Sequence, residues 1–186
     1  MVRNFQDRPV DPSALRRILE HGQRAPSAGY TQGYRFLVFV GEETAAFWDA
    51  ACSPQDPMRI RPGVLRAPVI IVPLVSKKAY LDRYAEPDKG WTDRDESRWP
   101  APFWALDAAF AAMLMLLTAV DEGLGALFFG LYPPENLPRF RGSFGIPDEY
   151  EPIGAIAVGH PAADDIPSSA ARGRLPLDEV VHRSRW

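Results

Sequence analysis

The sequence predicts a globular fold that combines several helices with the apolar strands of one sheet, and three observations predict it. The chain has 186 residues, 46% of them hydrophobic and 24% charged, which is enough to bury a core in one domain or at most two small ones. Short runs rich in β-branched and aromatic residues recur, as in interior strands. Segments with helix caps and apolar stripes lie between them.

The first half of the chain predicts two helices and two strands. Residues 12–22 form a helix in which Asp11 is the N-cap and Pro12 the first residue, both favoured at those positions. Residues 36–40 follow as a buried strand, and residues 42–51 as a second helix. The run 67–75 lacks polar alternation, which indicates an interior strand covered on both faces.

The middle of the chain predicts a loop and a long apolar helix. A short helix at 77–86 precedes a loop at 87–102, and ordered loops of this length are often lids or binding walls. Residues 102–122 form a helix that is apolar on nearly every side, with Asp107 as the one charged residue between 103 and 120, so this helix has to be enclosed. A second subunit would help to enclose it in so small a chain, and we therefore expect a homodimer with an extensive apolar interface.

The last elements follow the same rules. Residues 123–125 end the long helix and lead into a strand at 126–130, then a short helix at 134–144 and a strand at 153–159 that closes the sheet. From residue 160 onward the composition turns to proline, alanine, aspartate, serine and arginine. We expect residues 160–186 to form an extended C-terminal tail.

Composition excludes several function classes. The net charge of −3 comes from interspersed acids and bases, which argues against nucleic acid or an anionic membrane as partner. The apolar run 103–120 carries Asp107 and is short for a bilayer span, so a buried helix is expected there. One cysteine, Cys52, cannot form an internal disulfide, and the N-terminus lacks the apolar region of a signal peptide, which indicates the cytoplasm.

The sequence gives little support for a hydrolytic active site or for a metal site. The three histidines, His21, His160 and His182, lie far apart in the sequence and accompany no recognisable nucleophile motif, whereas a triad needs a nucleophile next to a base. Together with Cys52 they show no metal-ligand spacing. We expect surface or capping roles for all three, and no metal site.

The stretch from Arg24 to Phe36 is the most informative part of the chain. Pro26 fixes φ and blocks continuation of the helix, while Ala28 and Gly29 leave the backbone uncovered. Ser27 and Gln32, with Thr31, add hydroxyl and amide groups. The sequence therefore predicts a turn whose backbone and small polar side chains line one edge of a bound cofactor.

Several short strings, in this order, resemble the nitroreductase family of FMN-dependent oxidoreductases, and their collinear order makes the match specific. They are Arg3-Asn-Phe5 with Arg8-Pro-Val10, Ala25-Pro-Ser27 with Gln32, Ala67-Pro68, Gly123-Leu-Gly125 before Phe128-Phe-Gly130, Pro152-Ile-Gly-Ala before Gly159-His-Pro161, and Arg172-Gly-Arg-Leu-Pro-Leu177 with Glu179-Val-Val181.

The resemblance implies an α+β fold, in which a mostly antiparallel sheet is flanked by helices, over a single domain of residues 1–186. It also implies an intertwined homodimer with two FMN sites at the subunit boundary. The implied activity passes hydride from NAD(P)H through flavin N5 to a small aromatic acceptor of the nitroaromatic or quinone type. Because the chemistry belongs to the flavin, no catalytic side chain is expected.

The resemblance also assigns cofactor contacts from both ends of the chain. It places Arg172 and Arg174 on the FMN phosphate, for which guanidinium groups are well suited. It places Arg3 beside the ribityl chain and pyrimidine near N1 and O2, where a fixed cation stabilises the anionic reduced flavin. Met1 occupies a position where the family usually has serine, after a further arginine. This departure puts one expected phosphate contact in doubt, and two explanations stay open: weaker FMN binding, or a start of the chain that is wrongly chosen.

Further contacts come from the middle of the chain. Pro26, Ser27 and Gln32 match the family's contacts to the ribityl and pyrimidine edges, and the backbone amides of Phe129 and Gly130 match those to N5 and O4. A turn-capping role for Ser27 and core packing for the Phe129 side chain are the alternatives.

The acceptor side is less defined. Tyr30 stands where many relatives have asparagine, and Gly33 where many have proline, so the substrate shape is expected to differ. Trp99, Phe103 and Trp104 are candidates, with Tyr30, for the substrate wall, although Trp104 equally suits packing against the partner. Asp107 needs a hydrogen-bond donor, and we expect that pairing across the dimer rather than in the site.

Two alternatives to the oxidoreductase hypothesis stay open. One is a flavin-binding storage or sensing protein with little turnover. The other is a flavoenzyme of the same fold with different chemistry, such as reductive dehalogenation or fragmentation of the flavin. The sequence identifies neither the physiological acceptor nor a preference for NADH or NADPH, and a deazaflavin could replace FMN or donate the hydride.

Overall fold

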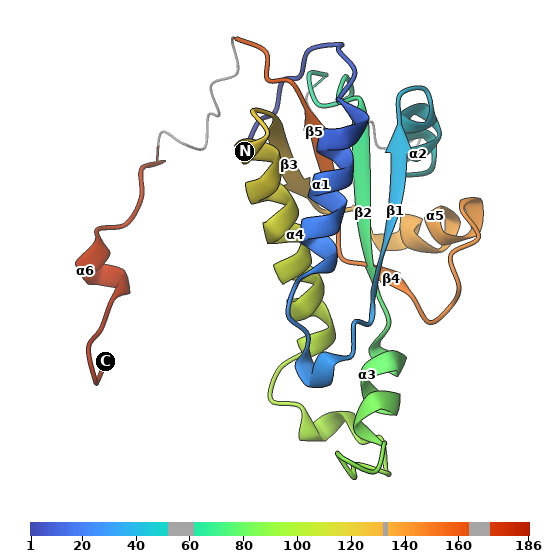
Figure 1. Cartoon of the computed structure of the whole chain (residues 1–186), viewed down its shortest axis with the longest axis vertical. Helices are drawn as coiled ribbons and strands as arrows, with labels where there is room; N and C mark the ends of the chain where they lie inside the picture. The colour runs from blue at the N-terminus through green and yellow to red at the C-terminus, as the bar shows by residue number, and fades with distance from the viewer. Residues whose placement is uncertain (52–61, 132–133, 164–171) are drawn as a thin grey trace.

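A computed structural model describes residues 1–51, 62–131, 134–163 and 172–186 of the chain. Its centre is an antiparallel sheet in the order β1-β2-β5-β3, with the short β4 also paired to β2 (Figure 1). The strands are β1 (Tyr34–Val40), β2 (Val69–Val75), β3 (Gly125–Phe129), β4 (Glu151–Pro152) and β5 (Ala155–Gly159). Cys52 lies outside the described residues.

Helices cover both faces of the sheet. α1 and α4 lie on one face, α2 and α5 on the other, and α3 extends beyond the end of β2 (Figure 1). The helices are α1 (Pro12–Gln23), α2 (Glu43–Ala51), α3 (Lys77–Tyr84), α4 (Phe103–Asp121), α5 (Leu137–Ser143) and α6 (Leu177–Val180); single 3₁₀ turns are Ala28–Tyr30, Glu96–Arg98 and Pro134–Asn136.

The central strand β2 shows why the sheet needs both layers. All seven of its residues are buried. Ile70 and Val72 join the core formed with α2 and α5, whereas Val69 and Ile71 join the core formed with α1 and α4. Neighbouring side chains of a strand point to opposite faces, so the continuous apolar run is explained, and the prediction of a strand covered on both faces is confirmed.

α1 begins and packs as its sequence predicts. The Asp11 side chain accepts a hydrogen bond from the Ser13 N–H at 2.7 Å, with Pro12 at the start of the helix. Ala14 and Ile18 are buried against the sheet and α4. A Cβ at Gly22 would lie 2.3 Å from the end of the Met115 side chain, so only glycine permits this close approach of α1 to α4.

Two element boundaries differ from the sequence prediction for local reasons. The helix expected at 134–144 is divided into a 3₁₀ turn and α5. Pro138 lies in the first turn of α5, and a proline there prevents a continuous α-helix from running through that point. The strand expected at 153–159 begins at Ala155, because Gly154 has a φ of 148°. That conformation interrupts the strand between β4 and β5.

α4 is only partly enclosed within one protomer, although a helix so apolar needs cover on all sides. One face, which carries Asp107, Ala108 and Met115, is buried. The other exposes a row of apolar side chains: Leu106 (38%), Phe110 (48%), Met113 (53%), Leu117 (59%) and Val120 (66%). The helix is long and apolar enough to cross a membrane, but its buried face packs against α1 and the sheet as a core helix does.

The C-terminal segment lies apart from the rest of the molecule. Every residue from 172 to 186 is exposed, and Figure 1 shows this segment, with α6, running beside α4 at a distance from it. Its exposed apolar side chains include Leu175, Leu177, Val180 and Val181. A segment of this composition gains stability only when another surface covers it.

An ion pair that joins α1 to the end of α4 predicts a pH effect. Arg17 donates from Nε and Nη2 to the two carboxylate oxygens of Glu122 at 2.5 and 2.6 Å, and these hydrogen bonds are the main reason why the pKa of Glu122 is lowered from 4.5. A lowered carboxyl pKa contributes stability at higher pH, and the contribution is lost as the pH falls through the folded value. We expect Glu122→Gln to lower the thermal unfolding midpoint at about pH 7 and to lose this effect under acid. If the thermal unfolding midpoints of Glu122→Gln and the wild-type protein differed as much in acid as near neutral pH, the prediction would be wrong.

Candidate functional site

The turn between α1 and β1 has an unusual backbone. Ser27 is extended, and Gly29, Tyr30 and Gln32 have φ angles of 62°, 55° and 51°. Residues other than glycine rarely adopt this left-handed conformation, and where they do the strain is often part of a functional site. Tyr30 is 79% exposed at the tip of the turn.

Internal hydrogen bonds shape the turn. The Ser27 Oγ accepts from the Gln32 N–H at 2.9 Å, and the Ser27 carbonyl accepts from the Tyr30 N–H at 2.9 Å. Ser27 therefore does cap the turn, as the alternative interpretation holds, while its hydroxyl hydrogen stays available for a ligand. The Gln32 side chain lies on the exposed side. This arrangement fits recognition of a polar edge.

The surrounding helices and strands fix the position of the turn. The buried Tyr34 hydroxyl lies 2.9 Å from the Gln23 carbonyl and 3.1 Å from the Ala25 carbonyl, to which it donates. Burial, and secondarily the Asp107 carboxylate, raises the pKa of Tyr34. At the other end of the turn, the Ser76 N–H donates to the Gly33 carbonyl at 2.9 Å. The turn is thus attached at both ends to buried groups.

Gly33 yields a stability prediction. A Cβ at this position would lie 2.5 Å from Cε2 of the buried Tyr80 ring and 3.0 Å from its Cδ2. Gly33→Ala is expected to lower the free energy of unfolding by about 1–3 kcal/mol, because overpacking forces side chains from their rotamers. Chemical denaturation measures this. Gly142→Ala is the control, since a Cβ there meets nothing within 4 Å; equal effects in both variants would contradict the prediction.

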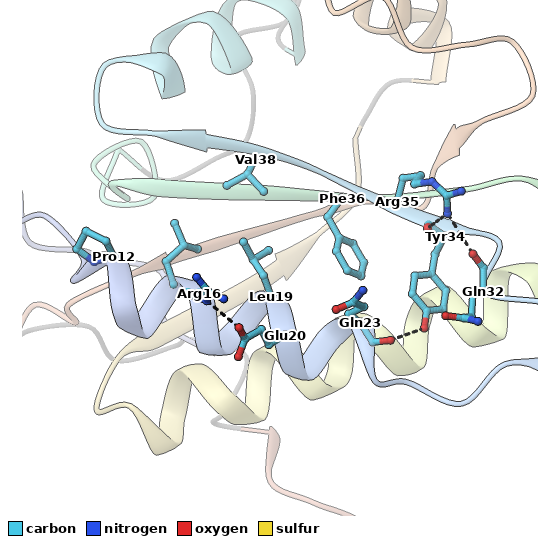
Figure 2. A pocket seen from close by; sticks show the side chains of 11 residues that line it. Pro12, Arg16, Leu19, Glu20, Gln23, Gln32, Tyr34, Arg35, Phe36 and Val38 are labelled. Atoms are coloured by element: carbon cyan, nitrogen blue, oxygen red, sulfur yellow. Dashed lines mark hydrogen bonds and ion pairs between the residues drawn. The ribbon is translucent and has the colours of Figure 1, made fainter. Parts of the chain in front are cut away.

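A groove of about 680 Å³ runs from the turn along α1 and the free edge of β1 (Figure 2). Leu15 and Leu19 of α1 and Phe36 and Val38 of β1 supply its apolar floor. Polar side chains form the rim: Arg16, Glu20, Gln23, Gln32 and Arg35. Among the strands that the structure describes, β1 pairs with β2 alone, so the groove lies beside a strand edge that an added strand could use.

Arg3 lies at the opposite end of the sheet from this turn. The Val2 N–H, next to Arg3, donates to the Ala126 carbonyl at 3.0 Å. Ala126 pairs with Val158 of β5, and Val158 pairs with Val69 at the start of β2. The turn leads into Tyr34, which is opposite Val75 at the end of β2. Six residues of strand span about 20 Å, and Figure 1 likewise shows the N-terminus and the turn at opposite ends.

The other expected cofactor residues are also dispersed in one protomer. Phe129 ends β3, and its ring stacks on Trp48 at a centroid distance of 5.7 Å, so its side chain is a packing group. Gly130 follows in open surroundings. Arg172 and Arg174 are exposed on the detached C-terminal segment. The structure thus brings Pro26, Ser27 and Gln32 together, but it does not gather the whole set within a single chain.

The comparisons with known proteins decide the family. A model of the nitroreductase family matches residues 1–160. The chain belongs to the nitroreductase family. It is 29% identical over 185 residues to NADPH-dependent oxidoreductases of Staphylococcus aureus, covering all of this chain and 70% of theirs. Similar solved structures include a putative nitroreductase in complex with FMN from Desulfovibrio desulfuricans (26% identity, TM-score 0.68, covering 100% and 91% of the two chains) and a nitroreductase family protein from Streptococcus pneumoniae (23%, 0.71, 98% and 94%).

Family membership confirms the sequence-based resemblance, and with it the α+β fold class and the assignment as an oxidoreductase enzyme. The histidines lie in separate places: the His21 ring contacts Thr118 on α4, while His160 follows β5. Among the described residues no group of three or more histidine, cysteine, aspartate or glutamate side chains could hold a metal ion.

The expected substrate-wall residues form part of an aromatic cluster at the start of α4. The Trp99 ring is its centre, and its Nε1 is buried without a hydrogen-bond partner in the described part of the chain. Its ring centroid lies 4.5–6.1 Å from those of Tyr80, Tyr84, Trp91, Phe103 and Trp104. Trp99 is therefore a packing residue, whereas Phe103 and Trp104 are half-buried and Tyr30 is exposed.

Asp107 corrects the sequence interpretation. Its side chain was expected to pair across the dimer, but it is 3% exposed and accepts a hydrogen bond from the Ala28 N–H of its own chain at 2.8 Å. Arg83 of α3, which no sequence signal singles out, donates to the Gly29 carbonyl. Both contacts depend on how distant helices meet the turn, and sequence spacing does not reveal that.

Proposed function

We propose that the protein is an FMN-dependent oxidoreductase that passes hydride from NADH or NADPH to a small aromatic acceptor of the nitroaromatic or quinone type. The observation that carries the proposal is the strained turn at residues 27–32, which presents the Ser27 hydroxyl and the Gln32 side-chain amide in a member of the nitroreductase family. Those groups fit the hydrogen-bonding edge of a flavin. The relatives named above, one of them in complex with FMN, support the same conclusion.

We also propose that two protomers form each site. Arg3 and Ser27 lie at opposite ends of the sheet in one protomer, so a flavin contacted by both has to lie between two copies. The exposed face of α4 supplies a suitable contact, because its apolar residues recur at positions 106, 110, 113, 117 and 120. Steps of three and four residues make a continuous seam along a helix, as in helix pairs that pack side by side.

The C-terminal segment gives this dimer its intertwined form. Its apolar side chains, including Leu175 and Leu177, are exposed in one protomer, and the groove along β1 offers an apolar floor beside an unpaired strand edge. We infer that residues 175–181 of one copy, which include α6, lie in the groove of the other, because their exposed apolar side chains can cover its apolar floor. This placement carries Arg172 and Arg174 to the subunit boundary.

The residues of the chain then have separate tasks. Arg172 and Arg174 hold the FMN phosphate by charge-assisted hydrogen bonds. Ser27 and Gln32 orient the ring by its polar edge, and Arg3 provides a fixed positive charge near N1 and O2 that favours the reduced form. When bound, FMN supplies the hydride-transfer chemistry at N5. The protein binds, orients and excludes water, and no side chain is required as nucleophile or base.

A spectrum of the purified protein tests the proposal. We expect a yellow protein that releases FMN, identified by mass spectrometry, on denaturation, and whose flavin absorbance bleaches with NADH or NADPH in the absence of air. Release of a deazaflavin, or failure to bind FMN that is added back, would contradict the FMN assignment. Lack of bleaching would favour a storage or sensing protein, and product analysis with quinones and nitroaromatics separates acceptor reduction from dehalogenation or flavin fragmentation. The cytoplasm stays the predicted compartment.

A further inference from the structure

We propose that Asp107 of α4 and Arg83 of α3 are positioning residues that clamp the cofactor-binding turn from two sides. The inference rests on the proposed function, because it assigns a task in FMN binding. It concerns residues that contact the turn backbone and not the ligand. The two side chains hold peptide groups on either side of the Ala28–Gly29 peptide, the N–H of Ala28 and the carbonyl of Gly29, and so fix the strained conformation that presents Ser27 and Gln32.

Asp107 is a buried acidic residue on a helix face that is otherwise mostly apolar. It is 3% exposed on a helix whose other core-facing residues are mostly apolar, and its Oδ2 accepts from the Ala28 N–H at 2.8 Å. Burying a carboxyl group is costly unless hydrogen bonds compensate, and a carboxylate acceptor gives a strong bond to a backbone amide. In the described part of the chain, the hydrogen bond from the Ala28 N–H joins Asp107 to the turn and offsets part of the cost of its burial.

The tyrosines around Asp107 enclose it. Burial first, and the Asp107 carboxylate second, raises the pKa of both Tyr34 and Tyr80. The Tyr80 hydroxyl is buried beside Asp107 and lacks hydrogen-bonding geometry with any described residue. The Tyr80 ring also closes the space beside Gly33. The Asp107 side chain therefore contacts the turn from among tightly packed tyrosine rings, which restrict its movement.

Arg83 holds the opposite side of the turn. Its Nε donates to the Gly29 carbonyl at 3.0 Å, while Nη1 and Nη2 donate to the two carboxylate oxygens of Asp88 at 2.7 and 2.8 Å. A bidentate pair fixes the plane of the guanidinium group, so Nε is held toward Gly29. A Cβ at Gly29 would also lie 2.8 Å from the Tyr84 ring, which shows how closely α3 meets the turn.

The clamp explains how the strain is maintained. Left-handed φ angles at Tyr30 and Gln32 are unfavourable for such residues, and they persist only where surrounding contacts over-determine the backbone. The contact from α4 and the contact from α3 flank Gly29 on either side, next to the strained residues. Removing either contact is therefore expected to release the turn into other conformations.

Hydrogen–deuterium exchange of the cofactor-free protein tests the clamp without reference to activity. Asp107→Leu removes the acceptor, Asp107→Asn keeps one, and Arg83→Met removes the donor. We expect exchange in residues 27–33 to be about tenfold faster or more in the Leu and Met variants, as for loss of a charge-assisted hydrogen bond, and to be near the wild-type rate in the Asn variant. Wild-type protection in both Asp107→Leu and Arg83→Met would overturn the proposal.

Two matched controls separate the clamp from general loosening. Thr118→Val removes another buried polar group of α4, one that contacts Leu114 and His21 instead of the turn. Arg98→Gln breaks a bidentate pair with Asp93 in the same region as Arg83, also away from the turn. Both controls are expected to leave exchange at residues 27–33 unchanged. Faster exchange at the turn in the controls would show a general effect and overturn the assignment.

FMN binding to the full-length variants provides the second readout. The dissociation constant is expected to rise about tenfold or more in Asp107→Leu and Arg83→Met, and Asp107→Asn is expected to restore binding. A loss in Asp107→Asn as large as in Asp107→Leu would refute the positioning role. If Asp107→Leu does not fold, Asp107→Asn and Arg83→Met decide the matter. If the wild-type protein binds no FMN, the proposed function fails while the exchange measurement still judges the clamp.

Discussion

Phe110→Lys combined with Leu117→Lys is expected to prevent formation of the proposed dimer and to abolish flavin binding. The two side chains lie two turns apart on the exposed face of α4, 48% and 59% exposed in one protomer. Their replacement therefore leaves the protomer core intact, but it places two buried like charges from each copy in a contact made of apolar groups. Like charges without partners in such a contact cost several kcal/mol.

Analytical ultracentrifugation measures the oligomeric state, and flavin absorbance after gel filtration measures retention of the cofactor. Glu42→Lys is a suitable control, because it changes charge by the same sign at an exposed position beside α2, far from the seam. Circular dichroism is expected to show unchanged secondary structure in all the variants. A double variant that stays dimeric, or a monomer that keeps its flavin, would contradict the shared site.

Arg172→Ala combined with Arg174→Ala is expected to weaken FMN binding by about 10²–10⁴-fold, because each hydrogen bond to a charged group contributes about 1.5–3 kcal/mol. Riboflavin, which lacks the phosphate, is expected to lose little affinity. This difference identifies the phosphate as the group contacted. Isothermal titration of the cofactor-free protein with each flavin gives both values.

The same segment supplies the control. Arg183→Ala combined with Arg185→Ala removes two exposed arginines at the very end of the chain, with the same change in net charge. FMN affinity is expected to fall only slightly in this variant. Equal losses from both pairs would point to a general electrostatic effect, and equal losses for FMN and riboflavin would show that Arg172 and Arg174 do not bind the phosphate.

The sequence predicts the elements whose signals are local. Asp11 and Pro12 mark the start of α1. The run from Val69 to Val75 is so apolar that it predicts an interior strand, and all its residues are buried. The division of the helix near Pro138 and the late start of β5 after Gly154 are shifts of a few residues with backbone causes. Boundaries of this kind depend on single φ angles, which composition specifies only weakly.

The site is less predictable than the fold. Pro26, Ser27 and Gln32 share one turn because they are neighbours in the sequence. Asp107 reaches that turn from 79 residues away and Arg83 from 54, so their roles depend on how α3 and α4 pack. The separation of Arg3 from Ser27 depends on strand register, and the proposed site that unites them needs a second protomer.

Mixed dimers of two inactive variants test most directly whether one flavin is shared by Arg3 of one protomer and Ser27 of the other. Arg3→Glu and Ser27→Trp are each expected to lose FMN and NAD(P)H-dependent reduction. When equal amounts are unfolded and refolded together, half of the dimers are mixed and each mixed dimer has one intact site, so flavin binding and activity are expected to return to about a quarter of the wild-type value. If the variants regain nothing together, both residues act within one chain and the two-protomer site is wrong.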